Sequence, residues 1–367
     1  MTTTEPIGWV ATEDSLARLQ DALANVAIAA VDTEFVREST YYPQLCLIQV
    51  ATHEHSACID CLAPLDFEPL YQLLFRPGFT WVVHSARQDL EVIWQRTGRL
   101  PPQLIDTQIA AALGGSAPQI GLEALLARTL GVELGESYAR TDWSRRPLPE
   151  AALKYALDDV HYLLTAWERL EAELEGLGRR DWLREECERT LAERPEADTL
   201  QVWARLKGVY GLPFPAQCAA LALVRWREAA AQKSDRPRRW LLTDEALLEV
   251  AAALPATTDD LAQLAPPKFV QKFGAAVVAA VAKRDEAELQ TEVRANASQA
   301  APDKNVIKSL QEQVRQRAAA LSIEPEILAT RRELVALAGG KPPPHFTQGW
   351  RATELAAVIS GVARVPD

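Results

Sequence analysis

Strand signals occur only in the front half of this chain, and this distribution limits its possible folds more than any other feature. The first run, Val26–Val31, is continuous, as expected of a central strand buried on both faces. Further strand-type runs lie at 45–50, 57–60, 81–84 and 104–105. Amphipathic helical stretches lie at 15–23, at 86–95, directly before Gly114, at 122–130 and at 149–174. Strands interleaved with helices in this way predict an α/β domain with a mixed sheet.

The rear half of the chain lacks strand signals and is predicted to be helical. Residues 200–283 show helical periodicity interrupted by prolines, and a second helical stretch covers 306–365. A polar, alanine-rich segment between them is typical of a linker or a solvated helix. We therefore expect an α/β domain over 1–195, a helical domain over 198–284, a linker over 285–302 and a second helical domain over 303–367.

The net charge of −11 is unevenly distributed along the chain. Residues 1–190 carry a net charge of −13, whereas residues 191–367 carry +2. An acidic half is poorly suited to bind phosphate passively. It suits a site loaded with cations, because metal ions neutralise the local negative charge.

The cysteines and the N-terminus indicate the compartment. Five scattered cysteines argue against a disulfide framework and for a reducing environment. The first residues lack the basic and apolar regions of a secretory signal, and no apolar run approaches the roughly 18–20 residues of a membrane span. We expect a cytoplasmic protein without a membrane partner, and no feature predicts a protein partner.

Two carboxylates, Asp32 and Glu34, directly follow the first apolar run. Side chains alternate along an extended chain, so both carboxylates project on the same side. Two acids this close repel each other, and a divalent cation is the simplest relief. The alternative interpretation is a solvated turn after a strand.

Asp89, Tyr155 and Asp159 are candidates on predicted helices. Asp89 lies near the start of a helix that follows a buried strand end, where ligands collect in α/β sheets, although a first-turn acid stabilised by the helix dipole has the same pattern. Tyr155 and Asp159 share one helix face, about 40° apart at about 3.6 residues per turn. An amphipathic helix with a packed Tyr and a solvated Asp explains that pair equally well.

Taken together, the four carboxylates Asp32, Glu34, Asp89 and Asp159 favour a two-metal site. Such a site needs several hard oxygen ligands on rigid elements, with ions roughly 3.5–4 Å apart. Hydrolysis of a phosphodiester uses one ion to generate hydroxide and the other to stabilise the leaving 3′-oxygen. Because oxygen ligands favour Mg²⁺ or Mn²⁺ over zinc, we expect two cations of this kind.

The order of these residues resembles a known family. D-x-E at 32–34, H-x₄-D at 84–89 and Y-x₃-D at 155–159 resemble the tyrosine-bearing branch of the DEDD exonucleases. Blocks at 40–49, 106–110 and 142–148 narrow the resemblance to bacterial ribonuclease D, and it covers most of residues 5–190. The resemblance implies an RNase H-like mixed sheet. It also implies that the four carboxylates hold two metals while Tyr155 orients the attacking water.

Weaker substrate-binding candidates lie in the same domain. His84 is a candidate contact for the terminal nucleotide, although a His at a strand end is more often structural. Phe35 is a candidate for stacking on the last base, worth roughly 1–3 kcal/mol, and is otherwise a core residue. Arg145 and Arg146 are candidates for clamping phosphates, with ordinary surface-loop charges as the alternative.

The region from 198 to 284 resembles the HRDC domain, a small helical module, and 303–367 resembles a more divergent second copy. Between Arg225 and Arg239 the first module carries a net charge of +4, with Trp226 and Trp240 beside it. This pattern is typical of a surface that follows a phosphate backbone. A solvated helix whose arginines cover apolar surface explains it equally well.

These features predict a hydrolytic 3′→5′ exoribonuclease that releases 5′-nucleoside monophosphates from RNA with a free 3′ end. The resemblance implies tRNA precursors as the substrate class. One alternative is a single-stranded DNA 3′→5′ exonuclease, because the same carboxylates cleave either polymer. Another is a catalytically silent nucleic-acid-binding protein, which the full set of four acids and Tyr155 argues against.

Overall fold

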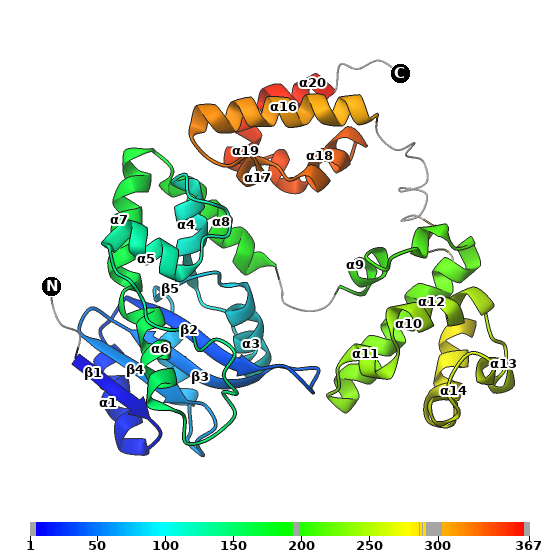
Figure 1. Cartoon of the computed structure of the whole chain (residues 1–367), viewed down its shortest axis with the longest axis horizontal. Helices are drawn as coiled ribbons and strands as arrows, with labels where there is room; N and C mark the ends of the chain where they lie inside the picture. The colour runs from blue at the N-terminus through cyan, green and yellow to red at the C-terminus, as the bar shows by residue number, and fades with distance from the viewer. Residues whose placement is uncertain (1–4, 194–197, 286, 288, 291–302, 363–367) are drawn as a thin grey trace. The chain divides into compact units, whose positions relative to one another are not determined.

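Six strands form one sheet in the front part of the chain (Figure 1). The computed structural model describes residues 5–193, 198–285, 287, 289–290 and 303–362. The sheet order is β1-β4-β3-β2-β5-β6, so β2 lies inside the sheet. β1 is parallel to β4, β4 is antiparallel to β3, and β5 is parallel to both β2 and β6. The predicted mixed sheet is thus confirmed. The strands are β1 Glu5–Val10, β2 Ile28–Val36, β3 Gln44–Ala51, β4 His55–Asp60, β5 Thr80–Val83 and β6 Gln103–Asp106.

Two strands differ from the sequence prediction. β1 was not predicted, because Pro6 and Gly8 weaken its local strand signal, and it forms by pairing with β4 at the sheet edge. β2 continues to Val36, so Asp32 and Glu34 lie within the strand rather than after it. Their polar side chains ended the apolar run in the sequence without ending the strand.

Eight helices accompany the sheet in the described part of the front region. α3 ends where predicted, at Gly98 in the left-handed conformation that glycine adopts readily. The predicted helix over 149–174 is two helices, α6 and α7, separated at Tyr162. α8 was not predicted. The helices are α1 Glu13–Leu23, α2 Glu68–Leu74, α3 Arg87–Thr97, α4 Thr107–Leu113, α5 Leu122–Leu130, α6 Glu150–His161, α7 Leu163–Gly176 and α8 Arg180–Ala192.

α6 covers one face of the sheet and thereby positions its own polar residues. It packs against β2 and β4 (Figure 1). A buried apolar cluster joins Leu47 of β3 and Cys58 of β4 to Ala152 and Ala156 of α6. The main core contains side chains from β2, β5, α1, α2, α3 and α7.

The C-terminal helices belong to the same compact unit as the α/β region, which comprises residues 1–36, 45–194 and 301–367. Trp350 stacks on Trp182 of α8 at 4.4 Å between ring centroids, and its indole N–H donates to Glu186. Arg351 forms an ion pair with the buried Glu186. The elements are α16 Lys304–Leu321, α17 Pro325–Leu328, α18 Arg331–Ala338, the 3₁₀ turn η2 Pro344–Phe346, α19 Gly349–Glu354 and α20 Ala356–Val362.

The other compact unit comprises residues 37–44 and 195–300. In it, the Tyr41 hydroxyl donates to Glu228 of α10, and the backbone amides of Tyr41 and Tyr42 both donate to Asp235. Most of the predicted linker lies outside the described residues. The elements are α9 Thr199–Ala204, the 3₁₀ turn η1 Val209–Gly211, α10 Phe214–Ser234, α11 Arg238–Leu241, α12 Asp244–Ala253, α13 Thr258–Ala262 and α14 Pro267–Ala282.

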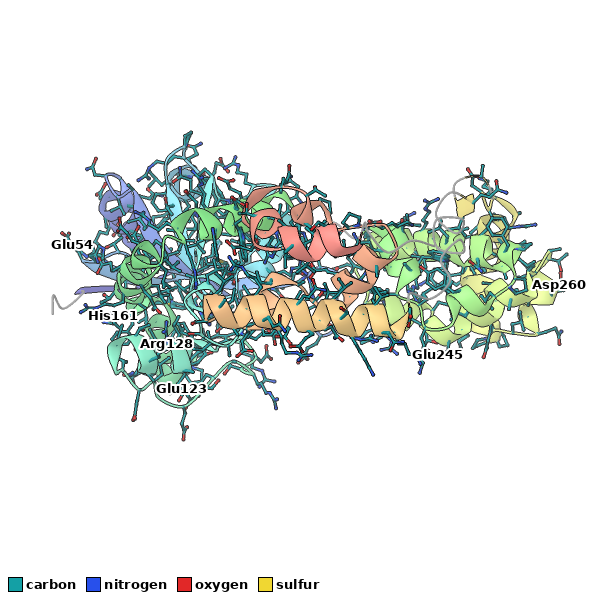
Figure 2. All side chains as sticks on the ribbon, turned by 90° about the horizontal axis from the view of Figure 1, so that it is seen from above. Glu54, Glu123, Arg128, His161, Glu245 and Asp260 are labelled. Atoms are coloured by element: carbon teal, nitrogen blue, oxygen red, sulfur yellow. The ribbon has the colours of Figure 1, made fainter. Side chains whose placement is uncertain are left out.

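Capping fixes the starts of two helices in this second unit. Thr243 accepts a hydrogen bond from Ala246 at the start of α12, and Thr257 with Asp260 forms a capping box at the start of α13. Figure 2 labels Glu245 and Asp260, acidic side chains in these first turns. Negative charge there is favoured by the helix dipole. Among the described residues, the helices are too short or too polar to cross a bilayer.

Candidate active site

Three carboxylates from two elements converge on one point of the sheet. β2 supplies Asp32 and Glu34, which are two residues apart on a strand and therefore share a face. α6 supplies Asp159. One oxygen from each of these three carboxylates lies within 4.8 Å of the other two. The alternative of a solvated turn is excluded for Asp32 and Glu34, because both lie in an interior strand of the sheet.

The fourth acid, Asp89, lies next to this group but outside the set of three. It is in the first turn of α3 and is only 7% exposed. Its Oδ1 accepts a hydrogen bond of 2.5 Å from the Oγ of Thr33, the residue between Asp32 and Glu34. Thr33 thus fixes the orientation of Asp89 toward β2. We call Asp32, Glu34, Asp89 and Asp159 the carboxylate cage.

The cage carboxylates are destabilised in their charged form. Burial, reinforced by Asp159, raises the pKa of Asp32 to about 8, and burial with Asp32, Asp159 and Asp89 raises the pKa of Glu34 to about 9. Burial raises the pKa of Asp159 to about 7, despite a hydrogen bond from Tyr155. The pKa of Asp89 is also raised, by burial first and by Asp32 second. Each shift reflects the cost of holding negative charge away from water, and in Asp32, Glu34 and Asp89 also next to other cage carboxylates.

This set of donors fits a divalent cation. The ligand atoms are hard carboxylate oxygens, which Mg²⁺ and Mn²⁺ prefer. They are partly buried and held by a strand and two helices, so their positions are fixed by the fold. A bound cation would offset both the burial of charge and the mutual repulsion that raise these pKa values.

Tyr155 lies one helical turn before Asp159 and is held from several sides. Its hydroxyl is hydrogen-bonded to Asp159 and to Ser137. The Tyr155 ring stacks on Trp143 at 6.4 Å between centroids and lies 6.3 Å from the ring of Tyr138. Burial, followed by the charge of Asp159, raises the pKa of the Tyr155 phenol. The phenol therefore stays protonated at neutral pH and is fixed in orientation.

His84 and Phe35 have protein partners of their own. The two ring nitrogens of His84 lie 3.0 Å from the Thr107 hydroxyl and 3.0 Å from the Ile120 carbonyl oxygen. Burial lowers the pKa of His84, so the ring is neutral at neutral pH. Phe35 is half-buried and packs against the main core. Both arrangements fit a structural role, with His84 as a hydrogen-bonded residue at a strand end and Phe35 as a core residue.

The two loop arginines lie in different environments. Arg146 forms two hydrogen bonds with the Asp60 carboxylate, at 2.9 and 2.5 Å, and donates to the carbonyl oxygens of Trp143 and Cys46. Arg145 pairs with Asp142 at 2.9 Å, and its side chain is 83% exposed. Arg146 thus ties its loop to β4, whereas Arg145 extends into solvent.

We expect Arg146→Ala to lower Tm by about 5 °C and Arg145→Ala to leave it unchanged. Removing Arg146 leaves the Asp60 carboxylate buried without its partner, at a cost of about 1–3 kcal/mol for a partly exposed pair. Thermal unfolding followed by circular dichroism measures both variants. A Tm for Arg146→Ala equal to that of wild type would contradict a structural role for this ion pair.

Several residues around the cage were missed by sequence reasoning. Thr33 stands between two predicted ligands, so the D-T-E order was a usable signal for it. Cys58 is buried, and its pKa is raised by burial first and then by Asp32, Glu34 and Asp159, which places it beside the cage. Ser137 and Trp143 touch Tyr155 from a loop, and no local pattern identifies such contacts.

The basic region of the second unit, between Arg225 and Arg239, contains both buried and exposed cations. Arg227 is 1% exposed and pairs with Asp244, and Arg238 pairs with Glu228. Arg236 and Arg239 are exposed. Trp226 packs against Phe269 and Phe273, whereas Trp240 is 63% exposed. Exposed cations therefore lie on α10, at Arg225 and Lys233, as well as around α11, whereas the exposed Trp240 lies in α11.

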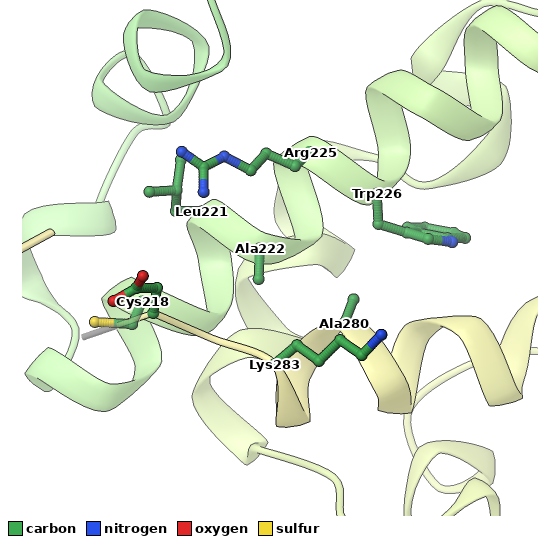
Figure 3. A pocket seen from close by; sticks show the side chains of 8 residues that line it. Cys218, Leu221, Ala222, Arg225, Trp226, Ala280 and Lys283 are labelled. Carbon is green, nitrogen blue, oxygen red and sulfur yellow. The ribbon is translucent and has the colours of Figure 1, made fainter. Parts of the chain in front are cut away.

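A pocket of about 350 Å³ lies between α10 and α14 of the same unit (Figure 3). Arg225 and Trp226 point away from each other in this view, so they do not jointly close over a ligand. Among the residues that line the pocket, Asp285 is the one carboxylate, and a divalent cation needs more oxygen ligands than it supplies. The lining consists of Cys218, Leu221, Ala222, Arg225, Trp226, Ala280, Lys283 and Asp285.

Known proteins resemble this chain in both sequence and fold. A 3′-5′ exonuclease family model matches residues 7–175, and the HRDC domain model matches residues 219–281. Ribonuclease D of Xanthomonas oryzae is 38% identical over 96% of this chain and 97% of its own length, and ribonuclease D of Nitrobacter hamburgensis is 35% identical over 93% and 91%. The crystal structure of Escherichia coli RNase D, described as an exoribonuclease involved in structured RNA processing, matches with a TM-score of 0.85. It is 30% identical and covers 98% of this chain and 99% of its own.

Proposed function

The chain belongs to the ribonuclease D family of 3′→5′ exoribonucleases, and from this premise we propose that the carboxylate cage is its hydrolytic site and holds two divalent cations. The single observation that carries this proposal is the convergence of Asp32, Glu34 and Asp159 within 4.8 Å, with Asp89 beside them. Mg²⁺ or Mn²⁺ fits the all-oxygen donor set.

The chain's own residues divide the work in the proposed site. Bound divalent ions supply Lewis-acid chemistry, increasing the acidity of water and neutralising charge on the leaving 3′-oxygen. The cage carboxylates would hold these cations at the edge of the core. Tyr155 stays protonated, because the pKa of its phenol is raised, so it orients the nucleophilic water by hydrogen bonding instead of removing its proton.

Tyr155→Phe is expected to lower turnover on RNA by about 10²-fold and to leave cation affinity unchanged. The phenylalanine ring keeps the stacking on Trp143 but lacks the hydroxyl that orients water. Single-turnover cleavage of an end-labelled oligonucleotide measures the first quantity, and Mn²⁺ titration by calorimetry measures the second. Turnover equal to that of wild type would remove Tyr155 from the reaction.

We propose RNA with a free 3′ end as the substrate, with tRNA precursors as the natural class and the cytoplasm as the compartment. The ribonuclease D relatives and the structured-RNA description of the Escherichia coli enzyme support this choice. In the second unit, Arg236, Arg239 and the exposed Trp240 suit a nucleic-acid strand, since a base stacked on an aromatic ring gains about 1–3 kcal/mol. Electrostatic contacts of this kind weaken as salt increases.

The test compares RNA and DNA oligonucleotides of one sequence, labelled at the 5′ end. We expect stepwise shortening of the RNA with release of 5′-nucleoside monophosphates, abolished by EDTA and restored by Mg²⁺ or Mn²⁺. Equal degradation of DNA would favour the DNA exonuclease alternative. Binding of RNA without cleavage at any cation concentration would favour a silent nucleic-acid-binding protein. A precursor tRNA with a 3′ extension, compared with a mature tRNA, then tests the substrate class.

A further inference from the structure

A buried amide without a partner lies in the interior of the sheet. Gln49 of β3 is 0% exposed. Neither its Nε2 nor its Oε1 has a hydrogen-bond partner among the described residues. An unpaired polar group costs about 1–3 kcal/mol when buried. An unpaired amide therefore costs stability here, in a strand whose neighbouring residues Ile48 and Val50 are apolar.

The strand register places this amide beside Cys58, on a strand that neighbours β2. Gln49 is paired directly with Cys58 on the antiparallel strand β4, so the two side chains lie on the same face, with Cβ atoms about 4.5–5.5 Å apart. β3 lies between β4 and β2, the strand that carries Asp32 and Glu34. The charges of Asp32, Glu34 and Asp159 act on the Cys58 thiol, so Cys58 lies near the cage.

α6 covers this face of the sheet. Leu47, two residues before Gln49 and thus on the same side of β3, packs in one cluster with Cys58, Ala152 and Ala156. Asp159 of the cage lies on the same helix. Gln49 is therefore enclosed by β2, β4 and α6, which also supply or adjoin three of the four cage acids.

We propose that Gln49 is a positioning residue of the carboxylate cage, whose Nε2–H donates to a carboxylate oxygen of β2 when divalent cations are bound. This inference rests on the proposed cation site. A carboxylate that coordinates a cation keeps a second oxygen with lone pairs, and a neighbouring amide donor fixes its direction. The same hydrogen bond would satisfy the buried amide donor, which has no partner among the described residues. Gln49 acts through Asp32 or Glu34 and has no contact with the reacting atoms.

The test is Gln49→Met, which removes the amide and nearly preserves the side-chain volume. Without cations, this variant is expected to have a Tm equal to or above that of wild type, because an unpaired buried amide is replaced by an apolar group. Its dissociation constant for Mn²⁺, measured by calorimetry without RNA, is expected to rise about 10-fold. The cation-induced increase in Tm is expected to shrink accordingly.

The matched control is Gln217→Met in α10. Gln217 is 7% exposed, its Nε2 donates to the Leu212 carbonyl oxygen at 2.8 Å, and its Oε1 has no hydrogen-bond partner. Its replacement is expected to lower Tm without changing Mn²⁺ affinity. A Tm that stays equal or rises in Gln49→Met but falls in Gln217→Met distinguishes a cage-positioning amide from an ordinary buried glutamine.

The outcomes separate this inference from the proposed function. If wild type binds Mn²⁺ and Gln49→Met binds it with equal affinity, Gln49 has no positioning role and the cation site stands. A cation-free Tm for Gln49→Met that falls as far as that of Gln217→Met would also overturn the inference, because it would show that Gln49 is already hydrogen-bonded in that state. Absence of Mn²⁺ binding by wild type would overturn the proposed site itself.

Discussion

Asp32→Asn is expected to lower exoribonuclease turnover by about 10³-fold while raising the Tm of the cation-free protein at pH 8. The loss of turnover follows from the loss of a carboxylate ligand, since charge stabilisation by a bound ion is worth several kcal/mol and about 4 kcal/mol corresponds to about 10³ in rate. The gain in stability follows from the removal of a buried charge beside Glu34 and Asp159. Single-turnover cleavage and thermal unfolding in EDTA measure the two effects.

Asp158→Asn is the matched control for this variant. Asp158 precedes the cage residue Asp159 on α6, but it pairs with Lys154 at the surface and lies outside the cage. We expect its turnover to stay within about threefold of wild type, because surface ion pairs contribute about 0–1 kcal/mol. An Asp32→Asn protein that cleaves RNA as fast as Asp158→Asn would contradict the assignment of Asp32 to the site.

The cation-free protein is expected to lose stability as pH rises from 6 to 9, and Mg²⁺ or Mn²⁺ is expected to restore it. The pKa of Asp32 is raised from 3.8 to about 8 and that of Glu34 from 4.5 to about 9. Well below pH 3.8 both carboxyls are protonated in the folded and unfolded states, so neither makes stability depend on pH. Between the unfolded and folded pKa values only the unfolded state ionises, so the free energy of unfolding falls with pH until about pH 9.

Thermal unfolding at four pH values, with EDTA and with saturating Mn²⁺, measures this effect. We expect Tm in EDTA to fall by about 5 °C or more between pH 6 and pH 9, and the increase in Tm caused by Mn²⁺ to be larger at pH 9 than at pH 6. Asp32→Asn should flatten the pH dependence in EDTA. A Tm that is independent of pH and of cations in wild type would contradict a buried, cation-binding cage.

The sequence was sufficient to predict those strands and helices that have a local periodic pattern of apolar residues. Five of the six strands were predicted, because their apolar runs are bounded by turn residues. β1 was missed, since its stability comes from pairing with β4 instead of from its own residues. α8 was also missed. It is rich in charged residues, and it is stabilised by contacts such as Trp182–Trp350 with a segment far along the chain.

The acids were predicted as a set, although each one alone was ambiguous. The spacing of Asp32 with Glu34 and of Tyr155 with Asp159 placed each pair on one face of its own element, which follows from strand and helix geometry alone. Whether the pairs meet depends on the packing of α6 against β2. That packing is a tertiary property, which the sequence anticipated only through the two-metal interpretation of the acids as a set and through the resemblance to ribonuclease D.

Periodicity and ordered motifs were enough to predict the mixed α/β architecture of the front region, the helical rear and the acids that make up the cage. The pairing of Arg146 with Asp60, the hydrogen bond between His84 and Thr107, and the buried, unpaired amide of Gln49 could be found only in the folded chain. The physical reason is that hydrogen bonding and burial depend on neighbours from distant strands and helices. Residue spacing along one segment carries no information about those neighbours.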